Sequence, residues 1–255
     1  MRTDHYRVTS VQLLADNIFL LGFVAPFIAE NVRPGQFINL RTTYASEPLL
    51  RRPFSVCSVH DDTVSIIFNA IGKGTELLCR KKPGDLLDVL GPLGVPFSID
   101  GNQFDTAILV AGGLGIAPLP ITQMHLKRMG KSVQCFIGTR TKESLPGLGL
   151  ENLHVATDNG SEGFHGNVVD LLMHIVPSFS GERVKLFGCG PTPMLKALAS
   201  FALERNIPCE VSLEGPMACG FGICQGCPVE LNGSEKKYAL MCKEGPTFDI
   251  RRVIF

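Results

Sequence analysis

The chain has 255 residues, and its 24 Lys and Arg residues balance 24 Asp and Glu residues, so its formal net charge is zero. A nucleic-acid-binding surface normally shows a basic excess, so the charge balance argues against a nucleic-acid partner. A hydrophobic content of 45% with 19% charged residues excludes a largely disordered chain. No stretch approaches the roughly 18 consecutive apolar residues of a membrane span. The first residues show no charged region followed by an apolar run, which predicts no signal peptide and a cytoplasmic location.

Residues 1–100 consist of short β-rich runs separated by turn signals. The expected strands are 8–11, 18–24, 37–40 and 64–69. Pro34-Gly35 and Pro83-Gly84-Asp85 mark turns between them. Strands spaced this closely predict a small antiparallel β-barrel as the first domain.

The pattern changes near residue 101. Residues 106–110 form a nearly continuous apolar run, as expected of a strand buried on both faces. The elements expected after it are a glycine turn at 111–118, a helix at 119–129 stopped by Gly130, strands at 133–138 and 184–188, and a helix at 192–204. Alternating strands and helices predict a parallel α/β domain over residues 101–210.

The last segment, residues 211–255, is too short for an apolar core of its own and needs another source of stability, such as a bound metal. Five of the nine cysteines are scattered along the chain, at positions 57, 79, 135, 189 and 209. The other four crowd into this segment as Cys219-x4-Cys224-x2-Cys227-x14-Cys242. That is the plant-type [2Fe–2S] spacing. Glycines between the ligands would let the backbone approach the inorganic sulfides.

Two alternatives to an iron–sulfur cluster stay open for these cysteines. Four thiolates also bind tetrahedral zinc, although zinc loops more often show two paired C-x2-C knuckles, and only Cys224 and Cys227 have that spacing here. The cysteines could also be unligated.

Two segments of the barrel are suited to a flavin dinucleotide. Arg52 offers a fork of donors for a pyrophosphate, and the Ser55 hydroxyl can bond a flavin edge. Strict strand alternation puts these side chains on opposite faces, so meeting one ligand requires an irregularity at Pro53. Gly72-Lys73-Gly74-Thr75 precedes an expected helix, whose N-terminal N–H groups suit a phosphate. Each motif alone could be a solvated arginine pair or a plain turn.

With these motifs in this order, the chain resembles the electron-transfer subunits of heteromeric, NAD-dependent bacterial dihydroorotate dehydrogenases, within the ferredoxin–NADP reductase superfamily. The resemblance covers essentially the whole chain. The motifs that carry it are Pro34-Gly35-Gln36-Phe37, Arg52-Pro53-Phe54-Ser55, Gly72-Lys73-Gly74-Thr75, Gly84-Asp85 through Gly91-Pro92-Leu93-Gly94, Gly112-Gly113-Leu114-Gly115, Gly188-Cys189-Gly190-Pro191 and Met217-Ala218-Cys219-Gly220-Phe221-Gly222.

The resemblance implies a role for each matching residue. Arg52, Pro53, Phe54 and Ser55 would hold FAD, Ile67, Phe68 and Asn69 would line the flavin, and Gly74 and Thr75 would bind the pyrophosphate. Cys219, Cys224, Cys227 and Cys242 would ligate a [2Fe–2S] cluster.

Two glycine turns in the α/β domain are candidates for the nicotinamide cosubstrate. Gly112 and Gly113 open a turn after a buried strand, and Gly188-Cys189-Gly190 ends a later strand of the same layer. The first turn does not match the G-x-G-x-x-G fingerprint, but both lie at the carboxyl edge of the sheet, where open α/β sheets bind ligands. The alternative is a pair of tight turns without ligand. Cys189 would either face the nicotinamide or serve as a small buried hydrophobe.

The resulting prediction is an electron relay, in which electrons from a partner's flavin pass singly through [2Fe–2S] and FAD delivers hydride to NAD⁺. We find no separate set of acid and base residues, which fits a catalytic subunit elsewhere. The resemblance implies an FMN-containing partner that oxidises dihydroorotate, in a 2+2 heterotetramer. Two other functions remain possible: the same relay serving a hydrogenase, sulfur reductase or transhydrogenase partner, and a zinc-stapled regulatory scaffold without enzymatic activity.

Overall fold

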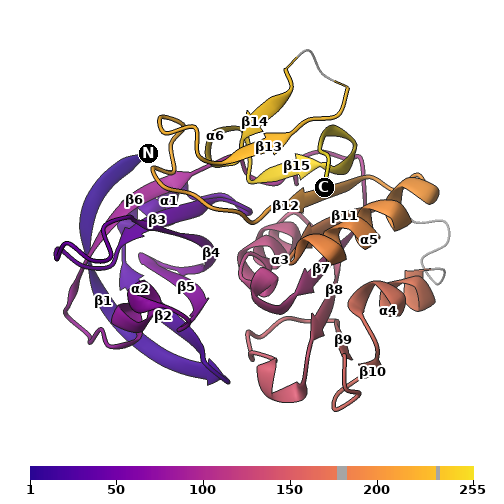
Figure 1. Ribbon diagram of the computed structural model, residues 1–255. Helices are drawn as coiled ribbons and strands as arrows, with labels where there is room; N and C mark the ends of the chain where they lie inside the picture. The colour runs from indigo at the N-terminus through magenta and orange to yellow at the C-terminus, as the bar shows by residue number, and fades with distance from the viewer. Residues whose placement is uncertain (177–182, 234–235) are drawn as a thin grey trace.

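The computed structural model describes residues 1–176, 183–233 and 236–255. Three parts follow one another along the chain (Figure 1). The first contains β1 (Arg2–Ala15), β2 (Ile18–Val24), α1 (Pro26–Asn31), β3 (Phe37–Arg41), β4 (Arg52–His60), β5 (Thr63–Asn69), α2 (Lys73–Cys79) and β6 (Leu86–Leu93). The second contains β7 (Thr106–Gly112), the 3₁₀ helix η1 (Gly113–Ile116), α3 (Leu119–Arg128), β8 (Ser132–Thr139), η2 (Lys142–Ser144), β9 (Leu153–Thr157), β10 (Phe164–His165), α4 (Val168–Ile175), β11 (Val184–Cys189), α5 (Thr192–Glu204) and β12 (Cys209–Ser212). The third contains β13 (Pro228–Glu230), β14 (Tyr238–Leu240), α6 (Met241–Glu244), β15 (Thr247–Asp249) and η4 (Ile250–Arg252).

The first part is a closed antiparallel barrel with strand order β1-β2-β5-β4-β3-β6. Side chains alternate between the two faces of each strand. In β3, Ile38 and Leu40 point into the barrel core, while Phe37 belongs to a separate apolar cluster shared with the C-terminal segment. The outer face of β3 is therefore covered by the end of the chain. The barrel prediction is confirmed, and β1 extends well beyond the strand expected at 8–11.

The second part is a sheet of order β10-β9-β8-β7-β11-β12-β15, parallel except for the last pair. Ala107, Leu109 and Ala111 of β7 pack with residues of η1 and α3 on one face. Ile108 and Val110 pack with α4 and α5 on the other. Burial on both faces is why β7 is apolar throughout, so the predicted α/β domain is confirmed.

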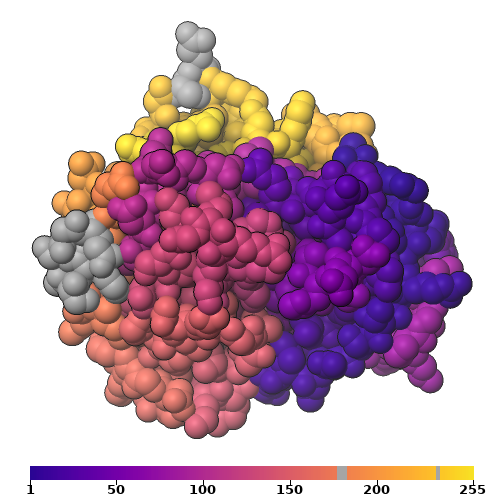
Figure 2. Space-filling model, turned by 180° about the vertical axis from the view of Figure 1, so that it is seen from behind, coloured from indigo at the N-terminus to yellow at the C-terminus, as the bar shows by residue number. Residues whose placement is uncertain are grey.

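The C-terminal segment lies over both the barrel and the sheet, as Figure 2 shows from behind. It contributes the β13–β14 pair and returns to the large sheet through β15, antiparallel to β12. Strand β12 crosses the expected limit at residue 210, and β15 pairs with it because the free edge of β12 offers unpaired backbone groups. The expected limits at residues 100 and 210 remain a prediction. Within the described ranges, no helix has the length and apolar composition of a membrane span.

Candidate functional site

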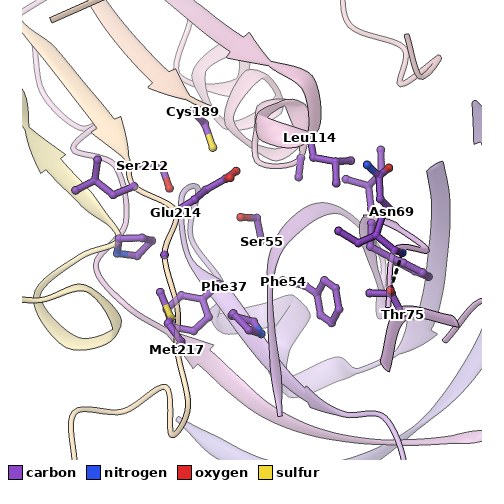
Figure 3. Close-up of a pocket in the computed structure, with 18 residues that line it drawn as sticks. Phe37, Phe54, Ser55, Asn69, Thr75, Leu114, Cys189, Ser212, Glu214 and Met217 are labelled. Carbon is purple, nitrogen blue, oxygen red and sulfur yellow. Dashed lines mark hydrogen bonds between the residues drawn. The ribbon is translucent and has the colours of Figure 1, made fainter. Parts of the chain in front are cut away.

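A cavity of about 310 Å³ lies where the three parts of the chain meet (Figure 3). Pro53, Phe54 and Ser55 line it from the barrel, and Leu114 and Cys189 line it from the α/β domain. The C-terminal segment closes it with residues that include Met217 and Pro246. The site is therefore assembled from segments distant in sequence.

Most barrel residues implied by the resemblance reach this cavity. Its lining includes Pro53, Phe54, Ser55, Ile67, Phe68, Asn69 and Thr75. The irregularity expected at Pro53 is absent: β4 pairs in register with β3 from Arg52 to Ser55, and the shift lies between Val56 and Ser58 on the β5 side. No irregularity is needed, because Arg52 and Ser55 meet different surroundings.

Arg52 lies across the start of α2 rather than in the cavity lining. A Cβ built on Gly74 would come within 2.7 Å of Arg52 Nε, so a larger residue here would force the guanidinium to shift. The Thr75 hydroxyl accepts hydrogen bonds from the N–H groups of Ile71 and Gly72, at 3.1 and 3.2 Å; the bond to Ile71 is dashed in Figure 3. An arginine side chain over a helix N-terminus suits a pyrophosphate.

Asn69 gives an independent test of whether a flavin fits the cavity. Its Oδ1 is buried and accepts no hydrogen bond from any described residue. A buried acceptor without a partner costs stability unless a ligand or water supplies the donor. An aromatic cofactor edge carrying N–H groups can supply it, and Phe54 and Phe68 offer apolar surface beside it. The residues present therefore fit FAD.

The opposite wall carries polar groups that the sequence reasoning missed. Ser212 ends β12, Glu214 follows it, and both face the cavity next to Cys189 (Figure 3). Burial raises the pKa of the Glu214 carboxyl. Burial, reinforced by the Glu214 charge, also raises the pKa of the Cys189 thiol. Cys189 is thus both buried and at the cavity wall, and its role toward the nicotinamide stays a prediction. The position of Glu214 directly after β12, at the carboxyl edge of the sheet, was the signal available in the sequence.

The glycine turns of the α/β domain border a second cavity of about 460 Å³. Gly112 and Gly113 line it, and Asn69 and Leu114 border both cavities. Gly188 and Gly190 line neither of the two. A Cβ on Gly188 would strike Leu198 of α5 at 2.5 Å, and a Cβ on Gly190 would come within 2.9 Å of the Gly112 backbone nitrogen. These two glycines permit close packing beside the site.

Two short contacts link the four clustered cysteines, one through a backbone N–H and one between two sulfur atoms. The Cys224 N–H lies 3.4 Å from Cys219 Sγ, and the Sγ atoms of Cys227 and Cys242 lie 3.2 Å apart. In the described ranges, no group of three or more His, Cys, Asp or Glu side chains is gathered as around a single metal ion. The C-x4-C-x2-C spacing of the first three cysteines is the plant-type [2Fe–2S] spacing.

The backbone of the cysteine loop is folded to favour the thiolate of Cys219. Burial raises the pKa of Cys219, but the N–H groups of Cys224, Phe221 and Ile223 outweigh it and bring this pKa to about 6. The Gly226 N–H points at Cys224 Sγ, at 3.5 Å. Gly220 and Gly222 have φ angles of +82° and +92°, which only glycine adopts without strain. The donor set therefore fits an iron–sulfur cluster.

Comparison with known proteins shows which families have a similar sequence. The family described as the iron–sulfur cluster binding domain of dihydroorotate dehydrogenase B matches residues 214–254. The "Dihydroorotate dehydrogenase B (NAD(+)), electron transfer subunit" of Geobacillus kaustophilus is 39% identical, over 98% of both chains. The protein of the same name from Bacillus caldolyticus is 38% identical, also over 98% of both chains.

The chain belongs to the family of dihydroorotate dehydrogenase B electron transfer subunits. The resemblance read from the sequence is confirmed.

Solved structures of other proteins share this fold. The structure of an NADH-dependent reduced ferredoxin–NADP oxidoreductase matches with a TM-score of 0.85 and 30% identity, covering 98% of this chain and 89% of that one. A ferredoxin–NADP⁺ reductase from Neisseria gonorrhoeae, solved with FAD and NADP, matches with a TM-score of 0.62 and 17% identity, covering 80% and 92%. The second likeness shows the fold alone.

Proposed function

We propose that this chain is the electron-transfer subunit of an NAD-dependent dihydroorotate dehydrogenase, with FAD in the cavity of Figure 3 and a [2Fe–2S] cluster on its four clustered cysteines. One observation carries the proposal: a single cavity joins the flavin-type barrel, the dinucleotide-type sheet and the cysteine segment. When bound, the flavin would collect two single electrons from the cluster, together with a proton, and pass them as a hydride to NAD⁺, a conversion that neither the cluster nor the nicotinamide supplies alone.

The barrel residues hold and orient the flavin. Arg52 and the start of α2 would take the pyrophosphate, and Asn69 Oδ1 would accept a hydrogen bond from the ring edge. Phe54 and Phe68 stack edge to face, with ring centroids 5.8 Å apart, and form an apolar wall. These contacts exclude water from one side of the cavity.

The α/β residues position the nicotinamide. The cavity beside Gly112 and Gly113 would take the nucleotide, and Cys189 and Glu214 stand opposite the barrel wall. Since burial raises the pKa values of both groups, they favour their neutral forms next to an apolar ring system.

The cysteine segment offers a face to a partner. Cys224 is exposed, and Ile223 next to it is 74% exposed, whereas Cys227 and Cys242 are buried. An electron transfer subunit requires a catalytic partner, and this exposed end of the cysteine loop is where we place it. The FMN of that partner, the 2+2 heterotetramer and the cytoplasmic location belong to the same proposal.

Replacing Cys224 with Ser tests the relay. The variant should lose electron transfer between partner and NAD, while NADH still reduces the FAD at close to the normal rate. Cys79→Ser is the matched control, because Cys79 lies in α2 outside the cluster segment. Both steps are followed anaerobically by absorbance, with iron and labile sulfide measured in parallel. Unimpaired transfer in Cys224→Ser would refute the relay, and a zinc-containing, colourless wild type would support the regulatory scaffold.

A second candidate function is the same relay serving a different partner. The 30% identity to the ferredoxin–NADP oxidoreductase structure favours this second function. The curated relatives, at 38–39% identity over nearly the whole chain, favour dihydroorotate oxidation. Co-purification distinguishes the two, because the partner that elutes with this chain either oxidises dihydroorotate or does not.

A further inference from the structure

Strand β3 pairs with β4, which carries the flavin-binding segment, and contacts the cysteine loop through the polar side chain of Asn39. Asn39 lies in β3 directly opposite Pro53 of β4. Its Nδ2 donates a hydrogen bond to the carbonyl of Cys219, at 3.1 Å, across 180 residues of sequence. One residue thus touches both the strand that lines the flavin cavity and the first cysteine of the cluster motif.

The packing around this contact leaves no freedom. Asn39 is 0% exposed. A Cβ built on Gly220 would come within 2.4 Å of Asn39 Nδ2, so the loop backbone lies directly on the amide. Gly220 also has a φ of +82°, which lets the loop turn at that point. The contact is therefore a close fit between β3 and the residue after Cys219.

The amide is poorly suited to a purely structural role. Asn39 Oδ1 is buried and accepts no hydrogen bond from the described residues. An apolar residue of similar volume would avoid this unsatisfied acceptor. The neighbouring outward-facing residue of β3, Phe37, does pack in an apolar way, in the cluster that contains Cys227 and Cys242. A polar group at position 39 therefore calls for a reason beyond packing.

We propose that Asn39 is a positioning residue that fixes the Cys219 end of the iron–sulfur cluster against the flavin-binding strands. The inference rests on the proposed function, since it assumes that the cluster and FAD occupy the sites described above. The Asn39 amide holds the backbone of the first ligand, and Phe37 belongs to the apolar cluster that contains Cys227 and Cys242, so β3 contributes to the support of both halves of the motif. Asn39 acts through the Cys219 backbone and touches neither reacting group.

The test compares Asn39→Leu and Asn39→Asp with the wild type, using the FAD- and cluster-loaded chain. Asn39→Leu lacks the donor to Cys219, whereas the aspartate of Asn39→Asp is fully buried, favours its protonated form and can still donate to that carbonyl. We expect cluster absorbance to decay about fivefold faster under a chelator in Asn39→Leu, as for loss of one hydrogen bond. The EPR spectrum and the midpoint potential of the reduced cluster should change in Asn39→Leu and stay close to the wild type in Asn39→Asp. Asn31→Leu is the control: its Nδ2 donates to the Phe27 carbonyl at 2.8 Å, far from the cysteines in sequence.

A mutant cycle keeps the proposal testable if a single variant folds poorly. Gly220→Ala is placed in the wild type and in Asn39→Ala. The backbone strain at Gly220 is common to both backgrounds and cancels, so the coupling reports the contact with Asn39. A coupling of about fivefold in the cluster-release rate supports the proposal. Additive effects, or an Asn39→Leu variant that loses thermal stability while its release rate, EPR spectrum and potential stay as in the wild type, overturn it. A wild type that binds FAD but no iron would overturn the proposed function and this inference together.

Discussion

Replacing Lys185 with Met should strongly destabilise the α/β domain. Lys185 Nζ donates to Glu210 Oε1 at 2.8 Å and to the Ser98 carbonyl at 2.7 Å, and Glu210 Oε2 accepts from the Ser98 N–H at 2.8 Å. The side chains of the pair are only 9% and 13% exposed. The three residues tie the connection after the barrel to β11 and β12.

The expected cost follows from the carboxylate left behind. Removing one partner of a buried ion pair costs about 3–5 kcal/mol, because the other charge remains buried without compensation. For a chain of this size roughly 2 °C of midpoint is lost per kcal/mol, so the unfolding midpoint should fall by about 6–10 °C. The assay is thermal unfolding of the FAD-loaded protein, followed by circular dichroism and by flavin fluorescence.

Two further variants make the reasoning refutable. Lys185→Met combined with Glu210→Gln removes the uncompensated charge and should recover more than half of the loss. Arg183→Met removes the exposed pair with Asp105, next to the same strand, and should produce no measurable shift. A single Lys185→Met variant that unfolds within 2 °C of the wild type, taking roughly 2 °C per kcal/mol, would refute the reasoning. So would a double variant without recovery.

Three other outcomes are expected. Gly74→Ala should weaken FAD binding about tenfold by displacing the charged Arg52 side chain, as titration would measure, whereas Gly72→Ala has open space and should bind normally. Gly115→Ala should abolish NADH-dependent flavin reduction, because its Cβ would lie 2.1 Å from the backbone carbonyl that ends β11; normal stopped-flow rates would contradict this. Because burial raises the pKa of Glu214, the folded state keeps a proton that the unfolded state releases, so stability falls as pH rises above the ordinary range of a glutamate. Glu214→Gln should flatten that decline in urea titrations of the FAD-free protein, and parallel pH profiles would show that Glu214 does not cause it.

Local sequence patterns were enough to predict the main elements and the motifs. The apolar run of β7, the glycine turn after it and the helix that ends before Gly130 follow one another closely along the chain, so the signals for all three are local. The spacing of Cys219, Cys224 and Cys227 is equally local, because one tight loop has to present three thiols. Such signals depend on backbone conformation and strand burial, which neighbouring residues decide.

Sequence reasoning was wrong where two distant segments share a surface. An irregularity at Pro53 was expected because strand alternation puts Arg52 and Ser55 on opposite faces, while both were assigned to one ligand. The barrel instead keeps β4 regular and brings Arg52 to α2, where Gly74 leaves room for it. Which ligand atoms each side chain meets depends on a second segment that alternation within one strand cannot specify.

By itself, the sequence determined the family, the barrel, the parallel sheet and the cluster spacing of the four cysteines, because each follows from short periodic or regularly spaced patterns. Only the tertiary structure decided that β15 completes the large sheet beside β12, that Glu214 faces Cys189, and that Asn39 supports the cysteine loop. Those contacts join residues up to 180 positions apart. Their existence depends on how the closed barrel, the sheet and the C-terminal segment pack together, and no local propensity encodes that packing.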